Sequence, residues 1–213
     1  MYAPKQFRED RRDVLLDAIR AIRFSALVTL HDGSLAAAHI PMIAHERDDS
    51  IILEGHVARG NRLWDLSAIG APALAIFQGP QAYVHPGWLA TKRETGRAVP
   101  TWNYVAVHAQ GQLFSTHDAD WLQRHVDDLT RMTETGRPEP WATADAPDGY
   151  IEGLLKGIVG LRLEVVQLEG VWKMIQHHPE ANRLGVIAGL SASSAPSDHA
   201  MAEIMQDREK QRT

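Results

Sequence analysis

Cysteine is absent from the 213-residue chain, and its absence excludes several kinds of chemistry. Disulfides, thiolate nucleophiles, zinc–thiolate sites and iron–sulfur clusters all require cysteine. The N-terminal stretch MYAPKQFREDRRDVLL carries charges of both signs and lacks the apolar core of a secretory signal. We therefore expect a cytoplasmic protein.

Long hydrophobic runs and an excess of positive charge are also missing. No segment approaches the roughly 20 consecutive apolar residues that a membrane span needs, so no membrane partner is expected. Lysine and arginine number 22 against 27 aspartate and glutamate, a net charge of −5. Because nucleic acid is bound mainly through a basic surface, this charge argues against coating of DNA or RNA by bulk electrostatics and leaves a local basic patch open.

The common catalytic motifs are missing as well. The chain has no GxGxxG after a strand, no glycine-rich phosphate loop ending in Lys-Ser/Thr, no HExxH and no GxSxG. No catalytic residue is assigned for this reason. His177 and His178 are adjacent, and neighbouring side chains point in different directions, so no metal site is predicted. One of them is expected to cap the helix that begins at Pro179.

Hydrophobic periodicity in the first part of the chain predicts a helix followed mainly by strands. Apolar residues recur at helical spacing over about 9–23. FSALVTLH and LAAAHIPMIAH flank the turn HDGS and predict a hairpin. SIILEGHV and PALAIFQG are expected as strands, with a short helix over NRLWDLSAIG between them.

The second part combines long strands with helices. NYVAVHAQGQLF alternates as a half-buried strand does, and Asp118 is expected to cap the helix after it. RPEPWATADAPDG is predicted as a loop, and IVGLRLEVVQLEGVWKMI as a strand that turns at Glu169-Gly170. A helix follows from Pro179 to about Gly189. After it come a flexible linker, SASSAPS, and a short polar terminal helix that is able to fray.

This order of elements predicts the fold class. Strands follow one another more often than they alternate with helices, which favours an antiparallel α+β sheet or small barrel over a parallel sheet. We expect about six to seven strands with peripheral helices. Residues 1–190 are predicted to form one domain with an N-terminal helix, and 191–213 a linker and a short C-terminal helix.

The segment HVARGNRLW is the first candidate binding site. A strand here gives way to a helix, whose N-terminus offers unpaired amides, and Arg59 immediately before it adds a guanidinium. This combination suits a phosphate group. The alternative is that Arg59 is a solvated turn residue and Asn61 only caps the helix.

The segment GPQAYVHPGWLATKRETGRAVPTWNY, residues 79–104, is the second candidate. Its aromatic side chains offer flat faces to a planar ligand, and its small polar groups can fix orientation in an apolar pocket. These residues are Tyr83, Trp88, Trp102, Thr101 and Asn103. Lys92, Arg93 and Arg97 are available to an anion. The alternative is aromatic packing of a long loop against the barrel.

Together with MYAPKQF and WKMIQHHPEANRLGVIAGL, these segments resemble the PaiB family of FMN-binding negative transcriptional regulators. The resemblance extends to about Leu190, and the VPTWNY block is specific. It implies a split β-barrel of the Greek-key type, related to pyridoxamine-phosphate oxidase. It also implies a homodimer with FMN at the subunit interface, and DNA as the partner of a regulator.

The resemblance further implies FMN contacts in three blocks. The implied contacts are His56, Arg59, Asn61 and Trp64; Tyr83, Trp88, Thr101, Trp102 and Asn103; and Lys173 and Gln176. The family usually reads Lys-(Leu/Met)-Ser-Gln-Asn-(Arg/Lys) near Lys173. In this chain Ile175 replaces the serine, and His177 and His178 replace the last two residues.

Two other functions are consistent with the same residues. In one, the protein is an FMN-dependent oxidoreductase of the related oxidase fold, whose bound flavin exchanges hydride with a small substrate or NAD(P)H. Such an enzyme needs no strong acid or base from the protein. In the other, the barrel binds haem through one of its histidines.

Overall fold

The computed structural model describes residues 1–31, 33–66 and 70–211. Its helices are α1 (Arg12–Ile22), α2 (Ala90–Thr95), α3 (Ala119–Glu134), α4 (Tyr150–Leu155), α5 (Glu180–Ser191) and α6 (Pro196–Lys210). Its strands are β1 (Arg8–Glu9), β2 (Phe24–His31), β3 (Ser34–Pro41), β4 (Ile43–Arg47), β5 (Ser50–Ala58), β6 (Ala71–Val84), β7 (Thr101–Thr116) and β8 (Ile158–Lys173). Short 3₁₀ helices are η1 (Lys5–Phe7), η2 (Arg62–Leu66), η3 (Pro86–Trp88) and η4 (Thr143–Asp145).

The strands form one sheet in the order β3-β2-β6-β7-β8-β5-β4, and β1 pairs with β8. The pairs β1–β8, β2–β3, β2–β6, β4–β5 and β5–β8 are antiparallel. The predicted α+β class with an antiparallel sheet is therefore confirmed. None of the described helices is long and apolar enough to cross a membrane.

The chain divides into two compact units. Unit 1 contains residues 1–15, 78–107 and 169–213, and unit 2 contains 16–77 and 108–168. The long strands β6, β7 and β8 contribute residues to both units. The predicted division at residue 190 stays a prediction.

Unit 2 contains the predicted hairpin, in which β2 and β3 pair from Phe24 opposite Pro41 to His31 opposite Ser34. Position 32 of the predicted turn lies outside the described residues. In β8, alternate residues Val159, Leu161 and Leu163 are fully buried, as the period-2 pattern indicates. The helix predicted over residues 61–70 is represented in the described residues by η2, and positions 67–69 lie outside the described residues.

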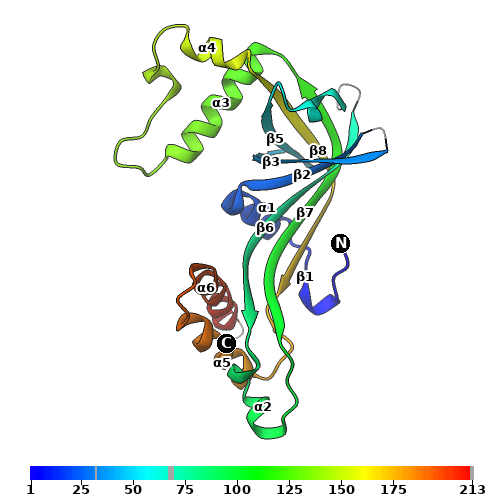
Figure 1. The fold of residues 1–213 in the computed structure, drawn as a ribbon, viewed down its shortest axis with the longest axis vertical. Coiled ribbons are helices and arrows are strands. Elements are labelled where there is room, and N and C mark those ends of the chain that lie inside the picture. Colours follow the sequence, from blue (N-terminus) through cyan, green and yellow to red (C-terminus); the bar gives the residue numbers. More distant parts are fainter. Residues whose placement is uncertain (32, 67–69, 212–213) are drawn as a thin grey trace. The chain divides into compact units, whose positions relative to one another are not determined.

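Helix α3 of unit 2 begins as predicted. The Asp118 carboxylate accepts a hydrogen bond from the Trp121 amide at 2.7 Å, so it caps the helix. Leu122 and His125 are buried on one face of α3. Figure 1 shows α4, which the sequence did not predict, next to α3.

In unit 1, α5 and α6 pack against each other (Figure 1). The Arg183 guanidinium donates to both carboxylate oxygens of Glu209, at 2.7 and 2.8 Å. Met201 and Met205 of α6 are buried. The expectation of a frayed terminal helix was therefore wrong, because α6 buries apolar side chains against the rest of unit 1.

Two local predictions were wrong. Strand β8 does not turn at Glu169-Gly170 but runs through Gly170, which pairs with Glu9 of β1. A Cβ on Gly170 would lie 2.2 Å from a Leu15 methyl carbon, so this glycine permits close packing rather than a turn. No histidine side chain caps α5, whose N-cap is Pro179 without a side-chain hydrogen bond.

Candidate functional site

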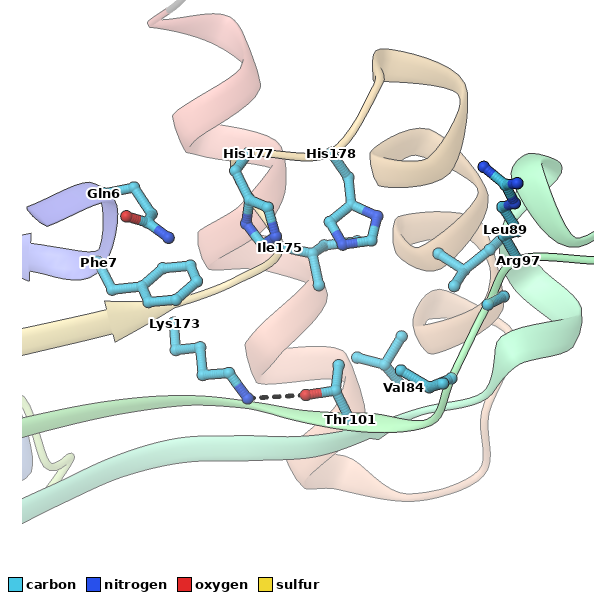
Figure 2. A pocket seen from close by; sticks show the side chains of 12 residues that line it. Gln6, Phe7, Val84, Leu89, Arg97, Thr101, Lys173, Ile175, His177 and His178 are labelled. Atoms are coloured by element: carbon cyan, nitrogen blue, oxygen red, sulfur yellow. Dashed lines mark hydrogen bonds between the residues drawn. The ribbon is translucent and has the colours of Figure 1, made fainter. Parts of the chain in front are cut away.

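Unit 1 contains a cavity of about 560 Å³. Its lining comes from three separate parts of the chain: the N-terminal segment, the loop between β6 and β7, and the end of β8 with the turn after it. The lining residues are Gln6, Phe7, Val84, Leu89, Arg97, Ala98, Val99, Thr101, Lys173, Ile175, His177 and His178. Figure 2 shows these side chains around the cavity.

Lys173 is the principal cation of this cavity. Its ammonium donates to the Thr101 hydroxyl at 2.7 Å and to the Trp102 carbonyl at 2.9 Å (Figure 2). It also lies 6.0 Å from the centroid of the Tyr104 ring. An ammonium has three N–H donors, so this arrangement fixes the charge in place and leaves one donor for a ligand.

The walls of the cavity are largely apolar. Phe7, Val84, Leu89 and Ile175 are all buried. Ile175 has a backbone φ of 48°, which is rare for a β-branched residue and strained. The turn at the end of β8 is therefore held by its surroundings in a conformation that isoleucine disfavours.

Two imidazoles lie at one end of the cavity. The rings of His177 and His178 are edge to face, with centroids 4.5 Å apart, and His177 also meets Phe7 at 5.3 Å. Burial, together with the neighbouring His177, lowers the pKa of His178. This end of the cavity is therefore polar but keeps a neutral ring at position 178 near neutral pH.

The predicted aromatic residues of unit 1 have different surroundings. Tyr83 and Trp102 meet edge to face with centroids 6.0 Å apart and are partly exposed, at 43% and 54%. Trp88 instead packs against α5, where a Cβ on Gly185 or Gly189 would lie within 2.3 Å of it. Tyr83 and Trp102 thus keep surface for a ligand, whereas Trp88 is largely used in packing.

Asn103 and Gln176 make internal hydrogen bonds in unit 1. Asn103 is fully buried; its amide donates to the Met205 sulfur at 3.3 Å, and its Oδ1 has no hydrogen-bond partner among the described atoms. Gln176 accepts from the Met174 amide at 2.7 Å and donates to the Gln6 carbonyl at 2.9 Å. Both side chains stabilise the framework around the cavity, and their contact with FMN stays a prediction.

The first predicted block lies in unit 2, where its side chains also bond to the protein. Arg59 donates through Nε to the Lys156 carbonyl at 2.9 Å, and the Trp64 indole donates to the Arg59 carbonyl at 2.9 Å. Asn61 accepts from the Leu63 amide at 3.2 Å, so the expected capping contact is present. Arg59 also lines a cleft of about 450 Å³, together with Lys156 and His117.

His56, the remaining predicted residue of this block, lies in unit 2 beside a histidine that was not predicted as a site residue. His56 Nδ1 is 3.1 Å from Nε2 of His125, which is 1% exposed. His125 falls on the buried stripe of α3, and that stripe was the only sequence signal for it. Within residues 1–31, 33–66 and 70–211, no three His, Asp or Glu side chains are grouped so that they could hold a metal ion.

Of the predicted residues, the cavity brings together Thr101 and Lys173. Sequence reasoning missed its apolar walls and the place of His177 and His178 in its lining. Phe7, Val84 and Ile175 read as ordinary core residues, because nothing in their local spacing indicates a cavity. The nearest signal was the departure from the family pattern at positions 175, 177 and 178.

Comparison with known proteins gives consistent matches. Residues 1–167 match the family described as "Putative FMN-binding domain". The "Protease synthase and sporulation protein PAI 2" of Bacillus subtilis is 31% identical over 210 residues, which is 99% of each chain.

Two solved structures have the same fold. The FAD and haem binding protein from Mycobacterium smegmatis has a TM-score of 0.58 at 18% identity, covering 85% of this chain and 80% of its own. The flavocytochrome Anf3 from Azotobacter vinelandii has a TM-score of 0.52 at 9% identity, covering 80% and 72%. These likenesses confirm the predicted split-barrel fold.

Proposed function

The chain belongs to the family of FMN-binding domains that its residues 1–167 match, and we propose that it binds FMN in the cavity of unit 1. The observation that carries this proposal is Lys173, held by Thr101 and the Trp102 carbonyl with one donor left. FMN combines a planar ring that has hydrogen-bond acceptors on one edge with a phosphate. When bound, it supplies reversible hydride and electron transfer.

The residues of the cavity fit such a group. The apolar walls suit the faces of a flavin ring, and the spare Lys173 donor suits an acceptor or anionic edge. Arg97, another lining residue, makes no side-chain hydrogen bond to the described residues and adds a second cation. The exposed faces of Tyr83 and Trp102 are proposed as further aromatic contacts, as the resemblance implies.

We also propose that the residues of unit 2 that were predicted as FMN contacts take part in binding. Arg59 is proposed as a phosphate ligand, since it lines a cleft that also contains the cation Lys156, and a guanidinium suits a phosphate. His56, Asn61 and Trp64 are proposed to hold this segment in position through the hydrogen bonds described above. A homodimer with FMN at the subunit interface is part of the proposal, because each bound FMN can then draw on residues of both chains.

A negative regulatory role is the finer proposal, supported by the resemblance to the PaiB family. The net charge of −5 argues against strong nonspecific DNA binding, so we propose that regulation depends on the flavin rather than on bulk charge. Retardation of DNA by the FMN-loaded protein tests this role directly. The cytoplasmic location is a further proposal, which cell fractionation tests.

Flavin absorbance of the purified protein, followed by titration of FMN fluorescence, tests the central proposal. Lys173→Met keeps the length of the side chain but removes its charge. We expect this substitution to lower the affinity for FMN at least tenfold, as loss of a charged hydrogen bond does. Lys210→Met, at the exposed end of α6, is the control and should bind FMN normally. Absence of flavin binding at pH 7 would contradict the proposal.

The same preparation separates the alternatives. Oxidation of NAD(P)H by the loaded protein faster than by free FMN would favour an oxidoreductase. A Soret band on addition of haem, lost in His177→Ala or His178→Ala, would favour a haem protein.

A further inference from the structure

The imidazole of His178 is held by a hydrogen-bond chain that begins at the backbone of α2. The Thr91 amide donates to Oδ1 of Asn182 at 3.0 Å. The other end of the Asn182 amide, Nδ2, lies 2.7 Å from the Thr91 hydroxyl and 3.2 Å from Nδ1 of His178. Asn182 is 1% exposed, so this chain is shielded from water.

The orientation of the Asn182 amide follows from the Thr91 backbone. A backbone N–H can only donate, so the atom that faces it must be the carbonyl oxygen of Asn182. Nδ2 is then the atom near His178, and both its hydrogens are committed, one to the Thr91 hydroxyl and one to His178. The amide therefore presents a donor, not an acceptor, to the imidazole.

This donor determines which tautomer His178 adopts. A nitrogen that accepts a hydrogen bond carries no proton, so Nδ1 of His178 is bare and the proton of the neutral ring lies on Nε2. Burial supports the neutral form, because it lowers the pKa of His178. The ring thus offers an N–H from its Nε2 side, and Figure 2 shows it directed toward Ile175 among the cavity-lining side chains.

The backbone around His178 is fixed as well. The His178 amide donates to the carbonyl of Ile175 at 2.8 Å, which closes the turn whose first residue has the strained φ of 48°. Arg183 donates to the His178 carbonyl at 2.6 Å. Strain of this kind persists only where the surroundings hold it, and it commonly accompanies a side chain placed for binding.

We propose that His178 is a specificity-determining residue of the unit 1 cavity: a neutral Nε2–H donor that selects ligands with a carbonyl or ring-nitrogen acceptor at this end. The proposal rests on the proposed function in that FMN, whose ring edge carries such acceptors, is the ligand tested. Lys173 supplies the charged donor of the cavity, and His178 supplies an uncharged one whose direction is set by Asn182.

The charged groups around His178 do not reverse this assignment. His177 is its neighbour on the same turn, Arg97 and Lys173 line the same cavity, and Arg183 contacts its carbonyl while paired with Glu209. The cationic members of this set all disfavour a positive imidazole. Glu209 accepts hydrogen bonds from Nε and Nη2 of Arg183, so its charge is balanced by that guanidinium.

Nuclear magnetic resonance of the ¹⁵N-labelled ligand-free protein tests the tautomer. We expect Nδ1 of His178 to show the shift of an unprotonated nitrogen and Nε2 that of an N–H at pH 7. In Asn182→Asp the facing atom becomes an anionic acceptor, so the pKa of His178 should rise by about 1–3 units. A proton on Nδ1 in the wild-type protein would overturn the inference whatever the behaviour of FMN.

FMN titration of His178 variants tests the donor role. His178→Phe keeps a flat ring without a donor and should weaken FMN about three- to tenfold, the range of one neutral hydrogen bond. His178→Gln restores an N–H and should recover much of this loss. Equal losses in both variants would assign His178 to packing and contradict the inference. Wild-type protein that does not bind FMN would contradict the proposed function instead, and the tautomer measurement would still decide this inference.

Discussion

The imidazoles of His56 on β5 and His125 on α3 share a hydrogen bond, with 3.1 Å between Nδ1 of His56 and Nε2 of His125. Trp121 stacks on His125 with its ring centroid 5.1 Å away. One of the two nitrogens must donate and the other accept, so at least one ring must be neutral. Burial is the main cause that lowers the pKa of His125 to about 4, and burial also lowers that of His56.

This pair predicts acid sensitivity. The unfolded chain binds a proton at His125 below about pH 6.5, whereas the folded chain resists it until about pH 4. Stability is therefore unaffected by this group above pH 6.5 and is lost as the pH falls from 6.5 to 4. The loss is on the order of 3 kcal/mol from the difference in pKa, measurable by urea denaturation across this range.

The matched variant for this prediction is His125→Phe, which keeps an aromatic ring for Trp121 but cannot titrate. Its stability should depend less steeply on pH between 6.5 and 4 than that of the wild-type protein. An identical pH dependence in the two proteins would show that another group causes the acid sensitivity.

Substitution of Gly111 in unit 2 is expected to lower the stability of the protein strongly. A Cβ at this position would lie 1.9 Å from the backbone oxygen of Glu164, and backbone cannot move aside as a flexible side chain can. Gly111→Ala should destabilise the protein by about 1–3 kcal/mol or more. Gly153→Ala, in helix α4 with nothing within 4 Å, should be neutral or stabilising. Similar unfolding midpoints for the two variants would contradict the close strand packing.

Substitution of Arg59 is expected to affect the binding of FMN and of riboflavin differently. Because the arginine is assigned to the phosphate, Arg59→Ala should lower the affinity for FMN by about tenfold or more and leave the affinity for riboflavin nearly unchanged. Arg62→Ala removes an exposed arginine that pairs with Asp65 and should change neither affinity. Calorimetric titration with both ligands provides the comparison, and equal losses for FMN and riboflavin would refute the phosphate role.

Much of the fold could be predicted because it depends on local patterns. The β2–β3 hairpin and the inward face of β7 follow from alternation of apolar residues, and the start of α3 follows from Asp118. Gly170 was misread as a turn because a glycine at a turn and a glycine under a packed side chain look alike in sequence. The burial of α6 rests on Met201 and Met205, too few apolar residues to reveal a docking face.

The candidate site was predictable only in part. Lys173 and Thr101 are 72 positions apart, and only the family resemblance brought them together in advance. The hydrogen-bond chain that holds His178 joins Thr91 to Asn182, which are 91 positions apart, and no local pattern encodes that contact. The sequence thus indicates which side chains are suited to a ligand, whereas the cavity itself arises from long-range packing.

The measurement that tests the central claim most directly is FMN affinity after the unit 1 cavity is filled. Ala98 lines the cavity, and Ala98→Trp places a large side chain there without removing any polar group. Ala188→Trp, on the exposed side of α5, is the control for the added ring. Circular dichroism first shows whether both variants are folded. If they are, we predict that fluorescence titration shows FMN binding abolished in Ala98→Trp and retained in Ala188→Trp. Unchanged FMN affinity in Ala98→Trp would contradict the assignment of FMN to this cavity.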